Sequence, residues 1–148
     1  INFLFQSFVA FVTLMAVFML LSLTDFKGGI DGLIGILVFL PIMGAIFSGL
    51  TILACTIVGL PIRLSKNIHG WWVRRPYLPI LLGVAAVALI IIAFLPSQMT
   101  WETYWENDYE VREHVPNLYY IATGWFSLCF SILHFYPLAY ILAKRKSE

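Results

Sequence analysis

The stretch LIGILVFLPIMGAIFSGLTILACTIVGLPIR, residues 33–63, decides the fold class of this chain. No charged residue interrupts it before Arg63, and it is long enough to cross a hydrocarbon core of about 30 Å. Small residues recur along it at spacings of three or four, which places them on one side of a helix. Helices in a bilayer associate by close backbone contact along such sides. We therefore predict a helix-packing seam, which consists of Gly44, Ser48, Thr51, Cys55 and Gly59.

The composition also indicates a membrane protein. Of the 148 residues, 61% are hydrophobic and 11% are charged, and the mean hydropathy is +0.89. A soluble domain of average composition carries about 25% charged residues. We predict an all-α integral membrane protein, a four-transmembrane-helix bundle that forms a single transmembrane domain over residues 1–148. The predicted spans, at about 1.5 Å per residue, cover residues 3–23, 33–60, 77–95 and 118–142.

The second span is too long for a straight helix. Its 28 residues would extend about 42 Å, and tilt alone would need an angle beyond the usual range of about 0–40°. Pro41 lacks a backbone donor and clashes with the preceding turn, so we predict a kink or a break there. Pro61 is expected to end the helix. A re-entrant hairpin is the alternative, and it requires burial of the irregular backbone.

Basic residues set the expected orientation, because Lys and Arg near a membrane mark its cytoplasmic side. They follow the second and the fourth span, which places both termini and the loop between the second and third spans inside. The inner side then carries seven basic residues and one acid, net +6, and the outer side two basic residues and seven acids, net −5. We expect a multi-pass protein of a bacterial inner membrane with cytoplasmic termini.

The inner loop between the second and third spans combines basic residues with tryptophans. Tryptophan prefers the headgroup level, and each basic residue near an anionic leaflet contributes about 1 kcal/mol. We predict membrane anchoring, with a docking surface for a phospholipid head group or a cytoplasmic partner as the alternative. Hydrophobic flanks and the positive-inside pattern explain the basic charge without nucleic acid. The anchoring residues are Arg63, Lys66, Trp71, Trp72, Arg74 and Arg75.

The outer loop, residues 97–117, is the most distinctive polar segment. Its aromatic residues fall at i, i+3, i+4 and i+8 with acids on the other side, which predicts a short amphipathic helix lying in the interface. An aromatic belt with a solvated acidic face is the simpler interpretation. The density of aromatic and acidic residues instead favours a surface that binds a partner. That predicted partner-binding surface consists of Trp101, Glu102, Tyr104, Trp105, Glu106, Tyr109 and Glu110.

The fourth span has one polar face, made by small and polar residues three and four positions apart. We predict that this face packs on the seam, with His134 bonded to Thr51, Ser48 or a backbone carbonyl. Such bonds contribute about 0.6 kcal/mol on average in membrane proteins. The face consists of Gly124, Ser127, Ser131 and His134.

Few groups in the predicted spans can perform chemistry. No Asp, Glu, Lys or Arg lies within them, whereas pumps and transporters usually rely on such residues. Cys55 and Cys129 fall at depths of roughly 8 and 20 Å from the inner face, too different for a disulfide, so we expect free thiols. A haem would need His69 and His134, from a loop and a span. We expect no catalytic residue, cofactor or metal site.

Two functions from different classes fit these features. The first is a non-enzymatic accessory subunit, assembly factor or immunity-type protein, which sits among membrane lipids and binds another membrane or extracytoplasmic protein through the outer loop. The second is an oligomeric small transporter or channel with a path lined by Ser127, Ser131 and His134. An enzyme acting on lipid through His69 or His134 is a third. Burial of the Ser/His face within one chain would leave no path for a solute.

Overall fold

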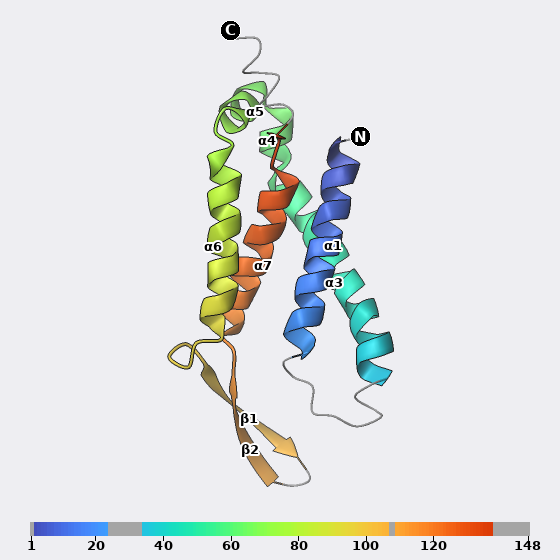
Figure 1. Ribbon diagram of the computed structural model, residues 1–148, viewed down its shortest axis with the longest axis vertical. Helices are drawn as coiled ribbons and strands as arrows, with labels where there is room; N and C mark the ends of the chain where they lie inside the picture. Colours follow the sequence, from blue (N-terminus) through green and yellow to red (C-terminus); the bar gives the residue numbers. More distant parts are fainter. Residues whose placement is uncertain (1, 24–33, 107–108, 138–148) are drawn as a thin grey trace.

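The computed structural model describes residues 2–23, 34–106 and 109–137, which are mostly helical (Figure 1). Parts of two predicted spans, residues 33 and 138–142, lie outside the described residues, as do the basic residues near the C-terminus. In chain order the elements are α1 (Asn2–Leu23), the π-helix η1 (Gly35–Phe39), α3 (Leu40–Val58), α4 (Leu60–Leu64), α5 (Lys66–Val73), α6 (Tyr77–Ala93), β1 (Thr100–Glu106), β2 (Tyr109–Val115) and α7 (Leu118–Leu133).

The long helices form two pairs, α1 with α3 and α6 with α7, and α7 also contacts α1 and α3. The start of α1 and the end of α7 lie at the same end of the molecule as α4 and α5 (Figure 1). This end, here called the basic end, carries Arg63, Lys66, Arg74 and Arg75. The two strands extend from the opposite end, here called the hairpin end. Among the described residues, four of the five basic residues therefore lie at the opposite end of the molecule from the acids, and Arg112 lies with the acids on the hairpin.

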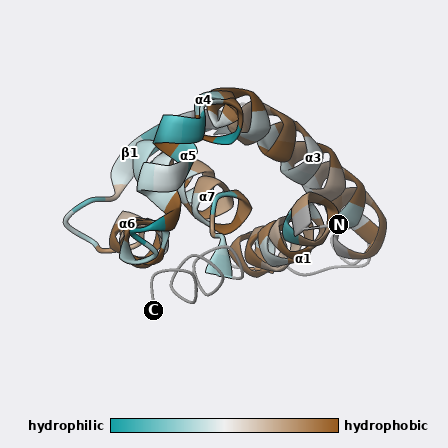
Figure 2. Ribbon diagram, turned by 90° about the horizontal axis from the view of Figure 1, so that it is seen from above, coloured by the Kyte–Doolittle hydropathy of each residue, from teal (hydrophilic) through white to brown (hydrophobic). Residues whose placement is uncertain are grey.

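The helices present large apolar side chains to the outside, as in a protein that faces lipid. Figure 2 shows hydrophobic colours along α1 and α3 and hydrophilic colours at α4 and α5. α1 and the helix Leu37–Val58 are each long and apolar enough to cross a membrane. α5 and α6, which meet at a bend of 73°, make a third candidate span, and α7 is apolar but shorter, with 16 residues. The described part of the chain thus has two or three candidate membrane-spanning helices.

The irregularity predicted near Pro41 is a π-helical turn. The backbone N–H of Leu40 donates to Gly35 O, five residues back, and α3 begins directly after this turn. Pro41 lies in the first turn of α3, and the wider π-turn makes room for its ring and its missing donor. At the other end, α3 stops at Val58, and Pro61 lies in the first turn of α4.

The seam of α3 is buried along its whole length, and two different helices cover it. Near the hairpin end, Gly44 faces α1, where an added Cβ would come within 2.8 Å of the Phe18 ring. In the middle, the hydroxyl of Thr51 accepts a hydrogen bond of 2.8 Å from Trp125 Nε1 of α7. Near the basic end, the His134 ring fills the space beside Gly59. The seam therefore holds α1 and α7 against α3.

Only part of the polar face of α7 packs on the seam as we predicted, because Gly124 and Ser131 turn to α6 instead. Gly124 lies against α6, where an added Cβ would come within 2.7 Å of Ala86 O. Ser131 Oγ donates to Pro79 O of α6 at 2.6 Å. Ser127 lines a pocket between α3 and α6. The small residues of α6 allow α7 to approach it closely, which explains why this face turns there.

His134 reaches the seam but does not bond to its hydroxyl groups. The ring is fully buried, and its Nδ1 lies 3.0 Å from Phe130 O. Of the three partners that we predicted for His134, the backbone carbonyl is the one observed, and it belongs to the ring's own helix.

The two cysteines meet in the core, contrary to the depths that we estimated. Both are buried and free, and Cys55 Sγ donates a hydrogen bond of 3.6 Å to Phe126 O of α7, three residues before Cys129. Our estimate counted the depth of Cys129 from residue 142, whereas α7 ends at Leu133. Cys129 therefore lies only one turn from the end of its helix, as Cys55 does in α3. They share a core cluster with Ala10, Leu14, Trp125 and Leu133.

The outer loop is not the amphipathic helix that we predicted. β1 and β2 pair in an antiparallel hairpin, with Trp101 opposite His114 and Trp105 opposite Glu110. Trp101 and Trp105 are four residues apart, which is one face of a helix but also one face of a strand. The loop is rich in Trp, Tyr, Thr and Val, which favour strands. Asn and Asp, the residue types at positions 107 and 108, favour turns.

The contact between Gly59 and His134 predicts a large effect of one methyl group. Gly59→Ala would drive a Cβ into the buried imidazole, and we expect it to lower the free energy of unfolding by about 1–3 kcal/mol. Gly49→Ala is the control, because Gly49 lies in the same helix with no atom within 4 Å of an added Cβ. Thermal unfolding in mild detergent measures both. Equal midpoints for the two variants would contradict the contact.

Candidate functional site

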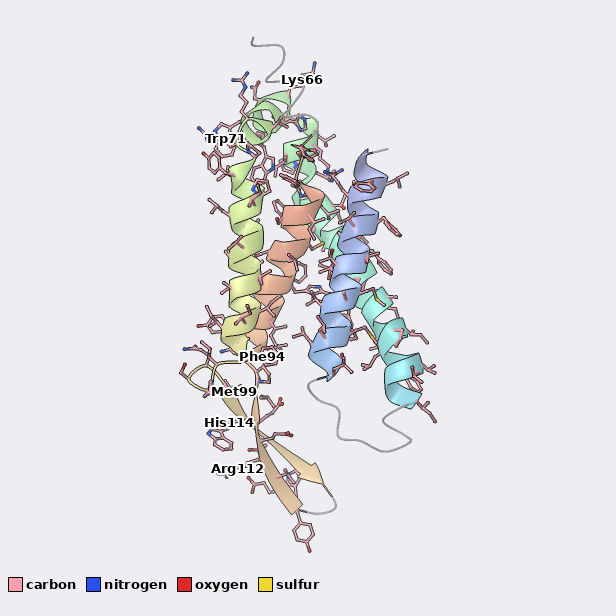
Figure 3. All side chains as sticks on the ribbon, viewed as in Figure 1. Lys66, Trp71, Phe94, Met99, Arg112 and His114 are labelled. Atoms are coloured by element: carbon pink, nitrogen blue, oxygen red, sulfur yellow. The ribbon has the colours of Figure 1, made fainter. Side chains whose placement is uncertain are left out.

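The hairpin extends beyond the helices and carries the residues predicted to bind a partner. Figure 3 shows His114 and Arg112 on the hairpin, at the opposite end of the molecule from Lys66 and Trp71. Trp101, Trp105 and Tyr109 are 67%, 74% and 76% exposed. The side chains of Tyr104 and Glu106, two further predicted residues, lie outside what the structure describes.

Alternation along the strands gives the hairpin two different faces. One face, here called the aromatic face, has every side chain exposed, whereas Val111, Glu113 and Val115 on the other face are half-buried. Trp101 stacks on His114 at 3.7 Å between ring centroids. The aromatic face consists of Trp101, Thr103, Trp105, Glu110, Arg112 and His114.

The register divides the predicted partner-binding residues between these faces. Trp101, Trp105 and Glu110 share the aromatic face, while Glu102 and Tyr109 belong to the other. On the aromatic face, Arg112 pairs with Glu110 at 3.2 Å. The aromatic face is therefore close to neutral, and its tryptophans are its most distinctive groups.

The hairpin also has open edges. Among the described residues, the sheet contains β1 and β2 and no third strand. Both outer edges thus present backbone N–H and C=O groups without a strand partner. An isolated two-stranded hairpin is marginally stable in water. Such a hairpin gains stability when another surface covers it.

A second candidate site lies at the basic end, around the last turn of α7. Three side chains from three elements bond the carbonyls there: Gln6 Nε2 donates to Phe135 O, Arg63 Nη2 to Leu133 O at 2.9 Å and Trp72 Nε1 to His134 O at 2.7 Å. The last carbonyls of a helix have no partner within it, and a cation is favourable at this end of the helix dipole. These side chains cap α7. Together with His69, His134 and Tyr136 they are called the inner cluster below.

The predicted anchoring residues therefore differ in where they point. Arg63 and Trp72 face inward, and the Arg63 guanidinium also lies 4.2 Å above the Phe3 ring. Lys66 and Arg74 are exposed. The remaining two associate with each other, since the Arg75 guanidinium lies 4.3 Å above the half-exposed Trp71 ring.

The inner cluster contains polar atoms that have no partner among the described residues. Each of these atoms is buried. Tyr136 connects several of them, because its ring packs edge-on against His69 at 5.1 Å and against His134 at 6.5 Å. The atoms are Gln6 Oε1, Arg63 Nε, His69 Nδ1, His134 Nε2 and Tyr136 Oη.

Sequence reasoning missed the inner cluster because its members come from α1, α4, α5 and the end of α7. The sequence did contain one indication of this cluster. His69, His134 and Arg63 lie at the ends of apolar segments, where few other polar residues occur. Within the described part of the chain, no group of three or more His, Cys, Asp or Glu side chains is placed to hold a metal.

Two apolar depressions accompany these sites. A groove of about 970 Å³ lies at the hairpin end, between α1, α3, α7 and the base of the hairpin, and Trp101 and Glu102 line part of it. A pocket of about 330 Å³ lies at the basic end between α1, α6 and the end of α7, and Gln6, Ser131 and Tyr136 line part of it.

Comparison with known proteins finds no match for this chain. No model of a known protein family matches the chain, and no curated protein and no solved structure matches it either.

Proposed function

We propose that this chain is a non-enzymatic, multi-pass membrane protein that binds another membrane or extracytoplasmic protein through the aromatic face of its hairpin. The observation that carries the proposal is the exposure of Trp101 and Trp105, 67% and 74%, on one face of a hairpin that projects beyond the helices. Tryptophan is the residue type most enriched at the energetic centres of protein interfaces. An accessory subunit, an assembly factor and an immunity-type protein all use such a surface.

The open strand edges support the same function. A partner can add an extended segment to an exposed edge, so that backbone bonds supply affinity and side-chain pockets supply specificity. The exposed backbone of β1 or β2 would then be paired, and the two tryptophans beside it would be covered. Because the aromatic face is close to neutral, the surface of the partner need not be basic. The acidic surface that we expected from the sequence would have favoured a basic partner.

The proposed topology has four spans, formed by α1, by η1 with α3, by α6, and by a fourth span that begins with α7. The separation of charges supports it, because four basic residues gather at one end and the acids of the hairpin at the other. By the positive-inside rule the basic end is cytoplasmic. The hairpin then lies outside, in a bacterial inner membrane on the periplasmic side.

The alternative, an oligomeric transporter or channel, has less support. Two of the three residues proposed to line its path are buried within one chain, Ser131 bonded to Pro79 O and His134 packed beside Gly59. A solute path along this face would have to open between α7 and its neighbours. No specific observation favours such opening.

The topology predicts opposite accessibility at the two ends. Single cysteines at Thr103, on the hairpin, and at Lys66, at the basic end, are exposed positions. A membrane-impermeant maleimide applied to intact cells should label Thr103→Cys at once and Lys66→Cys only after permeabilisation. The native cysteines are buried and serve as the background. Labelling of both positions from outside would overturn the topology.

The proposed interface predicts that a partner is lost when the tryptophans are removed. Trp101→Ala with Trp105→Ala should reduce a stoichiometric co-purifying protein at least tenfold in a mild-detergent pull-down, because each truncation at an interface centre costs about 2 kcal/mol or more. Trp71→Ala is the matched control, an exposed tryptophan at the other end of the molecule.

Both variants should unfold at the wild-type temperature, which separates lost binding from lost folding. Full recovery of the partner by the double variant would refute the aromatic face as the interface. Ion flux through pure homo-oligomers in liposomes would instead favour the channel alternative.

A further inference from the structure

We propose that the inner cluster and its adjoining pocket form a binding site for one anionic phospholipid. In this site the pocket receives an acyl chain, and the inner cluster receives the phosphate. The inference goes beyond the proposed function and concerns the opposite end of the molecule.

The pocket has the size and lining of an acyl-chain site. Its volume of about 330 Å³ falls in the range of about 300–1,000 Å³ that is common for small-molecule sites. Phe5 and Ile80 on its rim are 68% and 53% exposed, so the pocket meets the apolar outer surface of the helices. Its apolar lining comes from Phe5, Val9, Pro79, Ile80, Ile132 and Phe135.

The polar end of the pocket is continuous with the inner cluster. Gln6 and Tyr136 line the pocket, and both carry a buried oxygen without a hydrogen-bond partner among the described residues. Tyr136 packs on His69, whose Nδ1 is also without a partner. Arg63 bonds Leu133 O through Nη2, which leaves its Nε unpaired. An amphiphile could thus place its chain in the pocket and its head group at the end lined by Gln6 and Tyr136.

Three of the five unpaired atoms are suited to a phosphate, whereas Gln6 Oε1 can only accept hydrogen bonds and would not bind it. A phosphodiester offers only acceptor oxygens at its charged centre, and Arg63 Nε, His69 Nδ1 and Tyr136 Oη can all donate to it. Arginine is especially suited to phosphate because its guanidinium remains charged and presents several donors in one plane. Leaving such buried donors unpaired is unfavourable, so a bound phosphate would stabilise the fold.

The surroundings favour a lipid over a free anion. Lys66 and Arg74 are exposed at the same end, where basic residues concentrate anionic lipids near the surface. Free phosphate would use the inner cluster but would leave the apolar pocket without a ligand. The combination of both features commits the proposal to an anionic phospholipid.

The test uses the full chain, purified in mild detergent and delipidated. Phosphatidylglycerol is added as the probe, diacylglycerol with the same chains tests the need for phosphate, and inorganic phosphate tests the need for chains. Native mass spectrometry counts bound lipid, and the thermal unfolding midpoint reports stabilisation. We expect one phosphatidylglycerol per chain and a raised midpoint, with weak or no effect of the other two probes.

Three variants and one control locate the site. Arg63→Gln should weaken phosphatidylglycerol binding about tenfold or more, as for loss of a charge-assisted bond. Tyr136→Phe, which removes only the hydroxyl group, should weaken it by about threefold, and Ile80→Trp should block the pocket. Arg74→Gln removes the same charge at an exposed position and should lower affinity by only about two- to threefold, as for loss of general attraction at the surface.

If Arg63→Gln fails to fold, the lipid affinities of Tyr136→Phe and Ile80→Trp still test the site. Equal losses in Arg63→Gln and Arg74→Gln would indicate unspecific attraction to charge and would overturn the proposal. Equal stabilisation by inorganic phosphate and by phosphatidylglycerol would overturn the lipid as the ligand. Binding that Tyr136→Phe and Ile80→Trp leave unchanged would place the lipid elsewhere.

Discussion

The last carbonyls of α7 need donors from outside their own helix, and the rest of the structure is arranged to provide them. Within a bilayer, water cannot satisfy such groups, and each unpaired one is expensive. Here Gln6 of α1, Arg63 of α4 and Trp72 of α5 supply the donors. These side chains come from elements that are far apart in the sequence. Their bonds to the end of α7 therefore also fix the positions of α1, α4 and α5 relative to one another. α7 thereby connects its partner α6 to the α1–α3 pair.

The two sides of α7 pack against different helices. One side approaches α6 closely through Gly124 and Ser131, and the other places Trp125 and Cys129 in the core with α1 and α3. The polar groups of the helix are thereby used for packing, which leaves recognition to the ends of the molecule. The hairpin offers exposed aromatic rings and open edges, and the basic end offers donors beside an apolar pocket. The functions that we propose would use the hairpin for a partner protein and the basic end for a lipid.

The sequence predicted the structure correctly where a residue pattern is compatible with only one arrangement. The small-residue stripe of α3 predicted a buried side correctly, because few arrangements satisfy such a pattern. At Pro41 we predicted a kink or a break, and the structure has a π-helical turn that runs directly into α3. The hairpin was not predicted correctly, since the spacing of Trp101 and Trp105 fits a helix and a strand equally, and the helical period was chosen over the strand propensity of the neighbours. The direction of the α7 polar face depended on which neighbour lay closer, and no local pattern specifies that. The inner cluster depended on long-range contacts that spacing cannot reveal.

The central claim, that α7 packs against α3 and joins the helix pairs within one chain, is tested most directly by the two native cysteines. Cys55 and Cys129 are the only thiols in the chain, and the structure places them in one buried cluster between α3 and α7. Catalysed oxidation of the folded protein in mild detergent, followed by intact mass spectrometry, should yield a monomer that has lost two hydrogen atoms and no longer reacts with maleimide. Thiols that remain fully reactive after denaturation of the oxidised sample, or that cross-link only between chains, would contradict the account.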